Sequence, residues 1–196
     1  MPTNSADKKW NKIYSEKEIP INIEAKTSNV LQQHADLLPT TGTALDLACG
    51  FGGNAIFLSQ HGLQTHAWDI SQAAIEKLLA YCSEHSISMM ADERDVETNP
   101  PEQNTFDVIC VSYYLERNIC NDIMAALKPN GLLFYQTFVE EKVSDSGPSN
   151  PKYRLQPNEL LRLFSPLHIL VYQEYGSVGN VKKGLRDVAV LVAQKR

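Results

Sequence analysis

Short apolar runs alternate with amphipathic segments along most of the chain. The apolar runs predict buried strands over 44–49, 63–68, 87–91, 106–111, 132–138, 167–175 and 188–193. Apolar residues at helical spacing predict helices over 28–38, 54–61, 71–82, 119–127 and 157–164. Strands that alternate with helices form a parallel sheet with helices on both faces. The pattern therefore predicts an α/β fold.

Four stretches depart from this alternation. Residues 176–187 lack the periodicity of a crossover helix, so we expect the last two strands to form an antiparallel pair. Residues 128–131 (Lys-Pro-Asn-Gly) have the composition of a turn. The polar loop 140–156 is long for a connection inside a domain, which makes it a candidate lid. Residues 1–40 are expected to form a helical cap that carries Trp10 and Tyr14 on one helix face.

Composition narrows the class of protein. A chain of 196 residues is long enough for one domain with an adequate core, so we expect a single domain over 1–196. The net charge of −5 argues against unspecific binding to nucleic acid or anionic lipid. The four cysteines lack metal-ligand spacing, and we expect no bound metal, no signal peptide and no membrane span. These features favour a cytoplasmic protein, either a monomer or a homodimer.

The strongest chemical signal is the glycine-rich turn after the first predicted strand. Gly50 and Gly52 follow that strand and open a helix, which lets a ligand approach the backbone at the edge of the sheet. Asp69, the first acidic residue after the second strand, is placed to bind the ribose hydroxyls of a nucleoside. Asp95, after the third strand, is placed to reach an adenine amino group. The turn and the acids together predict a nucleoside-binding site.

Asp46 distinguishes between two kinds of nucleoside ligand. The glycines also fit the dinucleotide pattern, so a nicotinamide-dependent oxidoreductase is one alternative, and a non-catalytic nucleotide-binding module is another. An acidic residue just before the glycines would repel a pyrophosphate. The same carboxylate favours a cationic ligand such as S-adenosylmethionine, which carries a sulfonium and an α-ammonium group.

Successive motifs resemble those of class I S-adenosylmethionine-dependent methyltransferases. The motifs are Asp-x-Ala-Cys-Gly-x-Gly at 46–52, then Asp69, Asp95, 106–109 (Phe-Asp-Val-Ile) and 127–131 (Leu-Lys-Pro-Asn-Gly). The resemblance implies a Rossmann-like, seven-stranded, mostly parallel sheet with an antiparallel last strand. It also implies a cofactor site made of Tyr14, Asp46, Ala48, Cys49, Gly50, Gly52, Asn54, Asp69, Ile70, Asp95, Val96 and Val111.

A narrower resemblance is to the tellurite-resistance and thiopurine methyltransferase-like group. Its marks are Trp10-x-x-x-Tyr14, Tyr114-Leu115-x-Arg117, and Asn150-Pro151 followed by 155–160 (Leu-x-Pro-x-Glu-Leu). It implies a small-molecule acceptor, an oxyanion or a thiol-like compound, rather than a nucleic acid. Candidate residues on the acceptor side are Tyr113, Tyr114, Arg117 and Arg186. Methyl transfer from a sulfonium needs alignment more than acid–base chemistry, and no residue stands out as a general base.

Overall fold

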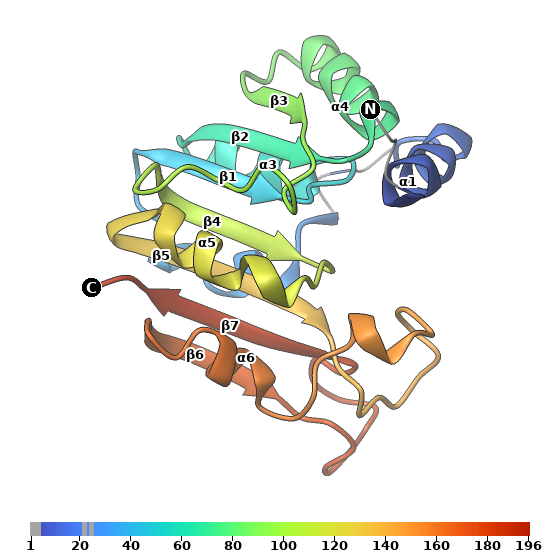
Figure 1. The fold of residues 1–196 in the computed structure, drawn as a ribbon, viewed down its shortest axis with the longest axis vertical. Coiled ribbons are helices and arrows are strands. Elements are labelled where there is room, and N and C mark those ends of the chain that lie inside the picture. Colours follow the sequence, from blue (N-terminus) through green and yellow to red (C-terminus); the bar gives the residue numbers. More distant parts are fainter. Residues whose placement is uncertain (1–4, 21–22, 24–25) are drawn as a thin grey trace.

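A seven-stranded sheet organises the computed structural model, which describes residues 5–20, 23 and 26–196 (Figure 1). Its strands are β1 (Thr43–Leu47), β2 (Gln64–Asp69), β3 (Met90–Glu93), β4 (Phe106–Ser112), β5 (Leu127–Phe138), β6 (His168–Glu174) and β7 (Val188–Gln194). Their order is β3-β2-β1-β4-β5-β7-β6, and only β7 runs antiparallel to its neighbours. The predicted α/β fold and its antiparallel final pair are confirmed.

Helices cover both faces of this sheet. The helices are α1 (Ser5–Glu16), α2 (Asn29–Gln33), α3 (Gly53–Gln60), α4 (Gln72–Glu84), α5 (Cys120–Ala126) and α6 (Glu159–Leu163). Leu45 and Leu47 of β1 point to the face that α5 and α6 cover, whereas Ala44 points to the face of α2 and α3. Alternate residues of β1, β4, β5 and β7 thus bury their side chains in different cores, which explains the nearly continuous apolar runs of these strands in the sequence.

Three predicted elements are corrected by the structure. The strand predicted as buried over 87–91 lies at Met90–Glu93, and none of its residues is buried. The predicted helix 28–38 is divided into α2 and a 3-10 turn, Ala35–Leu37, because the chain leaves helical geometry at His34 (φ −126°). The predicted turn at 128–131 lies inside β5 as a bulge: Phe106 pairs with Leu127, and the next pair is Val108 with Leu132. The bulged backbone stays paired because Asn130 donates to the Lys195 carbonyl, so the strand is not interrupted.

Two structures lie beyond the carboxyl ends of the parallel strands. The arrowheads of β1, β2, β4 and β5 point toward α1 and toward the loop over 139–156 (Figure 1). The loop includes a short 3-10 helix, Pro151–Tyr153, and its base is closed by a parallel bridge between Val139 and Leu155. The fold therefore places α1 and this loop at the edge where α/β sheets bind their ligands.

A fully buried glutamine connects the sheet to both α2 and the carboxyl edge. Gln136 lies in β5, where its side-chain oxygen accepts the Val30 N–H at 3.0 Å and its amide nitrogen donates to the Tyr113 hydroxyl at 2.8 Å. A polar side chain without exposure needs partners for its amide groups, and this one has them.

We expect Gln136→Met to destabilise the fold, because it leaves the buried Val30 N–H without an acceptor. The expected loss in unfolding free energy is about 1–3 kcal/mol, which lowers the melting temperature by about 2–10 °C. Denaturant unfolding measures this change. The control is Gln64→Met, at the exposed start of β2, which should stay close to the wild type. A loss no larger than that of the control would show that the buried hydrogen bond contributes nothing net.

Candidate functional site

The candidate site lies between β1 and β4, where the strand order reverses. Ala48 follows β1 with φ 58°, and Tyr113 follows β4 with φ 57°. Both are non-glycine residues in the left-handed region, which costs free energy and is held only where the surrounding structure enforces it. Such residues gather at functional sites, and here they flank the point where open α/β sheets bind ligands.

Asp46 is completely buried at the end of β1. Its Oδ2 accepts the Ala55 N–H at 3.0 Å, in the first turn of α3, and its Oδ1 receives a longer bond of 3.4 Å from Asn54. Burial raises the pKa of Asp46 to about 7, and the hydrogen bonds from Asn54 and Ala55 only partly oppose this effect. The negative charge of the carboxylate is therefore only partly stabilised by its hydrogen bonds, and a cationic ligand would stabilise it further.

Asp69 ends β2 and is 6% exposed. Its Oδ2 accepts the Gly50 N–H at 2.8 Å, and its Oδ1 accepts the Ser71 N–H at 2.9 Å. Burial raises the pKa of Asp69 above its ordinary value, against these backbone hydrogen bonds. Asp46 and Asp69 thus hold the glycine turn from its two ends, and each carboxylate keeps lone pairs for a further donor.

Asn54 connects the turn to β4 and to the segment before α2. Its amide nitrogen donates to Ser112 Oγ at 2.8 Å, and its Oδ1 accepts the Ser28 N–H at 2.8 Å. Ser112 is the last residue of β4, so this bond joins the carboxyl ends of the two strands that flank the site. The sequence analysis included Asn54 but missed Ser112, which carries no distinctive pattern.

The two glycines of the turn are required for different reasons. A Cβ at Gly50 would lie 2.6 Å from the Tyr14 hydroxyl oxygen, and Gly50 has φ 55°. A Cβ at Gly52 would lie 2.5 Å from a methyl carbon of Leu78, and Gly52 has φ 81°. We expected Gly52 to make room for the ligand, but its missing side chain makes room for the buried Leu78 of α4. Any role of Gly52 toward a ligand therefore belongs to its backbone.

Tyr14 lies over this turn. Its ring meets the edge of Phe51 at a centroid distance of 4.9 Å, and Trp10 lies on its other side at 5.9 Å. Burial raises the pKa of Tyr14 well above its ordinary value, and the nearby Asp69 adds to the effect. The predicted pairing of Trp10 and Tyr14 on one face of a helix is present, and it brings Tyr14 to the predicted cofactor residues.

The other predicted cofactor residues lie around the same edge. Asp95 follows β3, and its Oδ1 accepts the Glu97 N–H at 3.0 Å. Val96 is 6% exposed and Val111 is fully buried, so both belong to the core at this edge. The two remaining residues are only partly buried: Ile70 follows β2, and Cys49 lies in the turn.

Two tyrosines follow β4 on the predicted acceptor side. Tyr113 is 51% exposed, its hydroxyl accepts a hydrogen bond from Gln136, and its N–H donates to the Gln136 carbonyl at 2.8 Å. Tyr114 points toward Glu97, to which its hydroxyl donates at 3.4 Å. Burial raises the pKa of both phenols, for Tyr114 with a further contribution from the charge of Glu97. Both therefore stay protonated near neutral pH and act as hydrogen-bond donors.

The guanidinium of Arg117, a candidate residue on the acceptor side, is occupied by partners within the protein. Its Nε and one terminal nitrogen bind both oxygens of Glu159, at 2.6 and 3.0 Å. The terminal nitrogens also donate to the carbonyls of Lys152 and Arg154. Four of its five N–H donors are thus used to fasten the loop 139–156 to α6. The sequence did not indicate that Glu159 is the partner of Arg117, because the two residues are 42 positions apart.

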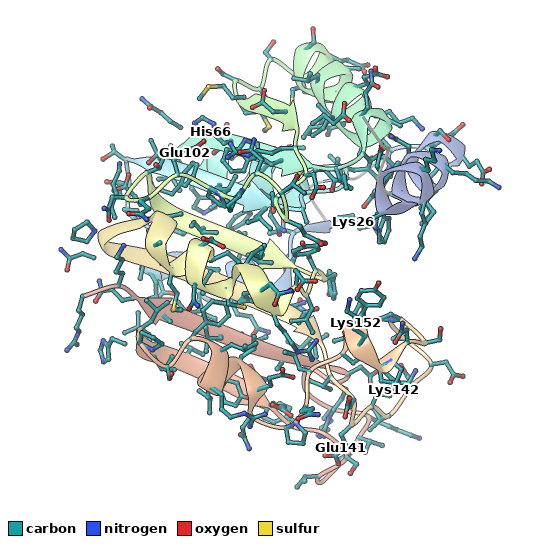
Figure 2. The ribbon with its side chains drawn as sticks, in the orientation of Figure 1. Lys26, His66, Glu102, Glu141, Lys142 and Lys152 are labelled. Carbon is teal, nitrogen blue, oxygen red and sulfur yellow. The ribbon has the colours of Figure 1, made fainter. Side chains whose placement is uncertain are left out.

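Arg186 is likewise used inside a loop. Its guanidinium donates to the carbonyls of Gly176, Val178, Asn180 and Lys183 and so closes the connection between β6 and β7. The adjacent Asp187 accepts hydrogen bonds from the Val143 N–H and from Ser144, and Glu141 accepts the Ser177 N–H. Glu141, Lys142 and Lys152 all project from the loop 139–156 (Figure 2). The candidate lid is therefore fastened to the β6–β7 connection.

Two further properties concern the part of the chain that the structure describes. Within residues 5–20, 23 and 26–196, no three His, Cys, Asp or Glu side chains gather in an arrangement able to hold a metal ion. The helices in these ranges are too short or too polar to cross a membrane.

Comparison with known proteins agrees with this geometry. Residues 44–131, which run from β1 into β5, match the model of a family described as a methyltransferase domain. This segment is similar to the methyltransferase domains of that family. The antiparallel β7 and the order of the strands complete the class I fold around it. S-adenosylmethionine is the cofactor that this family implies.

Similar solved structures share the fold at low sequence identity. TehB from Haemophilus influenzae is 20% identical with a TM-score of 0.69, over 95% of this chain and 67% of that one. A SAM-dependent methyltransferase from Aquifex aeolicus is 14% identical with a TM-score of 0.69, over 97% and 98% of the two chains. The curated protein Hemagglutinin 1 of Eikenella corrodens is 27% identical over 139 residues. These residues are 66% of this chain but only 45% of that relative, so the chain spans less than half of its length.

We expect the stability of the protein to fall as the pH rises, because the folded state holds the proton of Asp46 more tightly than the unfolded chain does. This contribution is complete below the ordinary pKa of 3.8 and is lost as the pH rises through about 7. The raised pKa of Asp69 acts in the same direction. Between about pH 5 and pH 7 the contribution of Asp46 to the unfolding free energy should fall by about 2 kcal/mol.

Denaturant unfolding of Asp46→Asn across the same range checks this assignment. The variant cannot ionise at this position, so its stability should depend much less on pH. Asp145→Asn, in the exposed part of the loop 139–156, is the control and should keep the pH dependence of the wild type. Equal slopes for wild type and Asp46→Asn would contradict the raised pKa.

Proposed function

We propose that this protein is an S-adenosylmethionine-dependent methyltransferase that methylates a small molecule. The observation that carries the proposal is the pair of buried carboxylates, Asp46 and Asp69, at the two ends of the glycine turn. A cationic nucleoside satisfies both, because its positive charge compensates Asp46 and its ribose hydroxyls donate to Asp69. The residues present therefore fit the cofactor that the family implies.

Each residue of the site has a role in this proposal. The cofactor would supply a methyl group bonded to a positively charged sulfur. A nucleophile that attacks the methyl carbon in line takes the methyl group, and the sulfur is left as a neutral thioether. Asp46 and the backbone of the turn bind the methionine end, Asp69 binds the ribose, and Asp95 with Val96 flanks the adenine. Asn54 fixes the distance between the turn and Ser112 of β4. The chain contributes alignment and exclusion of water rather than a covalent step.

The acceptor is proposed to be a soft nucleophile of the thiol type. Tyr113 and Tyr114 remain protonated, so they can orient an acceptor but cannot remove its proton. The carboxylates of Asp95, Glu97 and Glu116 all act on Tyr114, and the nearby Arg117 is already paired with Glu159. This surrounding charge disfavours an oxyanion, the other acceptor that the tellurite-resistance group suggests. A thiol has an ordinary pKa near 8.5 and needs no strong base.

Three wider features belong to the same proposal. Residues 1–196 act as one methyltransferase domain, with α1 as the cap and the loop 139–156 as the wall of the acceptor side. The four cysteines are free thiols, which suits a reducing compartment, and we propose the cytoplasm. An oxidoreductase using a nicotinamide cofactor is not favoured, because the buried Asp46 would repel a pyrophosphate at the turn.

A thermal-shift panel tests the class of cofactor. We expect S-adenosylmethionine and S-adenosylhomocysteine at about 100 times their Kd to stabilise the protein by about 2.7 kcal/mol. NADH and NADPH at equal concentration should have no effect. If NADH or NADPH stabilised the protein and S-adenosylmethionine did not, the proposed class of cofactor would be wrong. Release of S-adenosylhomocysteine on addition of 2-mercaptoethanol or thiophenol, compared with tellurite, then tests the acceptor class.

Asp69→Ala tests the ribose contact. A hydrogen bond to a charged acceptor contributes about 1.5–3 kcal/mol, so calorimetry should show S-adenosylmethionine binding weakened by roughly ten- to a hundredfold. The variant also loses the acceptor for the Gly50 N–H, so its unfolding free energy should fall as well. Asp92→Ala, at an exposed position of β3, is the control. If Asp69→Ala bound S-adenosylmethionine with the wild-type affinity, Asp69 would not be a ligand-binding residue.

A further inference from the structure

Helix α1 covers the predicted cofactor residues. Tyr14 lies against Gly50, and with α1 in this position Gly50 is buried and Asp69 is 6% exposed. With 6% of its surface exposed, Asp69 presents little of its carboxylate to a nucleoside while Tyr14 lies on the turn. Movement of α1 away from the turn would open this edge of the sheet.

The packing of α1 is weak enough to allow such a movement. None of the described side chains of α1, at residues 6–16, is fully buried, whereas α3 and α4 bury several each. Segments with few buried apolar side chains open locally at low free-energy cost. In Figure 1, α1 lies beside α4, beyond the carboxyl ends of the parallel strands.

Polar contacts with α4 hold α1 in place. Asn11 Oδ1 accepts the Ser71 hydroxyl at 3.0 Å and the Ala73 N–H at 3.1 Å, at the N-terminus of α4. At the other end of α1, Lys77 Nζ donates to the carbonyls of Tyr14 and Ser15 at 2.7 and 3.2 Å. A cation at a helix C-terminus satisfies carbonyls that have no partner within the helix. The second contact therefore includes the backbone of Tyr14 itself.

We propose that α1 is a gate over the cofactor site and that Lys77 and Asn11 are its latch. Both are positioning residues: Asn11 of α1 binds α4, and Lys77 of α4 binds α1 and lies 6.0 Å from the centre of the Phe51 ring in the glycine turn. They act on the cofactor through the placement of Tyr14 and of this turn. The inference rests on the proposed function, because it takes S-adenosylmethionine as the ligand that enters. A latch holds the gate closed both before and after binding, so loosening it raises the rates of entry and exit together.

Stopped-flow binding of S-adenosylmethionine distinguishes this gate from a fixed wall. Trp10, 40% exposed and next to Tyr14, reports on α1, whereas Trp68 is 4% exposed in the core. Lys77→Met keeps the apolar stem and removes the ammonium. We expect the association and dissociation rate constants both to rise about five- to tenfold, since a partly exposed charged hydrogen bond is lost. The Kd should change less than about twofold, because both rates rise together.

Matched variants distinguish loss of the latch from the effect of removing any lysine near the site. Lys12→Met removes a lysine from an exposed position of α1 itself and should keep both wild-type rates. Lys77→Arg retains a donor and should restore slow exchange at least in part, and Asn11→Ala should raise both rates as Lys77→Met does. Unchanged rates in Lys77→Met would overturn the proposal. A faster dissociation alone, with a weaker Kd, would also overturn it, because α1 would then be a fixed wall of the site.

Hydrogen exchange without ligand tests the gate independently of the proposed function. Lys77→Met should speed exchange of the amides of α1 by about five- to tenfold, while β4 and β5 exchange as in the wild type. Unchanged exchange in α1 would overturn the gate. If α1 opens in this way but the wild type binds no S-adenosylmethionine by calorimetry, the gate stands and the proposed function fails.

Discussion

The hydrogen bonds from the glycine turn to two buried carboxylates are the interaction on which the rest of the site depends. Asp46 binds the first turn of α3, and Asp69 binds the turn through Gly50 and the start of α4 through Ser71. Backbone N–H groups at helix N-termini stabilise negative charge, which allows both carboxylates to be buried at all. The compensation is incomplete for Asp46, whose pKa reaches about 7. The same interaction that shapes the turn thus leaves a negative charge for a cationic ligand.

A second constraint fixes the opposite side of the site. Tyr113 adopts a left-handed conformation because Gln136 holds both its N–H and its hydroxyl. Gln136 also binds Val30 at the start of α2, so one buried side chain joins β5, α2 and the end of β4. Hydrogen bonds to the sheet, rather than to the loop after Tyr113, therefore hold the left-handed backbone of this residue in place. This arrangement leaves the Tyr113 hydroxyl proton available toward the carboxyl edge.

Charged residues at the acceptor side mainly build loops. Arg117 joins Glu159 to the backbone of the loop 139–156, and Arg186 closes the connection between β6 and β7. Asp187 and Glu141 then tie these two loops to each other. Arg117 is thus paired with a carboxylate, and the carboxylates of Asp95, Glu97 and Glu116 act on the neighbouring Tyr114. Within the described residues, Arg186 is held by backbone carbonyls alone and keeps its positive charge uncompensated.

The sequence by itself determined the sheet and its antiparallel end, and it predicted the place of the candidate site. Apolar runs, helical spacing and the acids around Gly50 are local patterns, and local patterns survive in a linear sequence. Even Gln136 left a local signal, as a polar residue within the apolar run 132–138. Only the tertiary structure decided which partners each polar group has. Arg117 and Glu159 are 42 residues apart, Gln136 and Val30 are 106 apart, and Lys77 meets Tyr14 across 63. Hydrogen bonds at such separations depend on how the elements pack, which no spacing along the chain records.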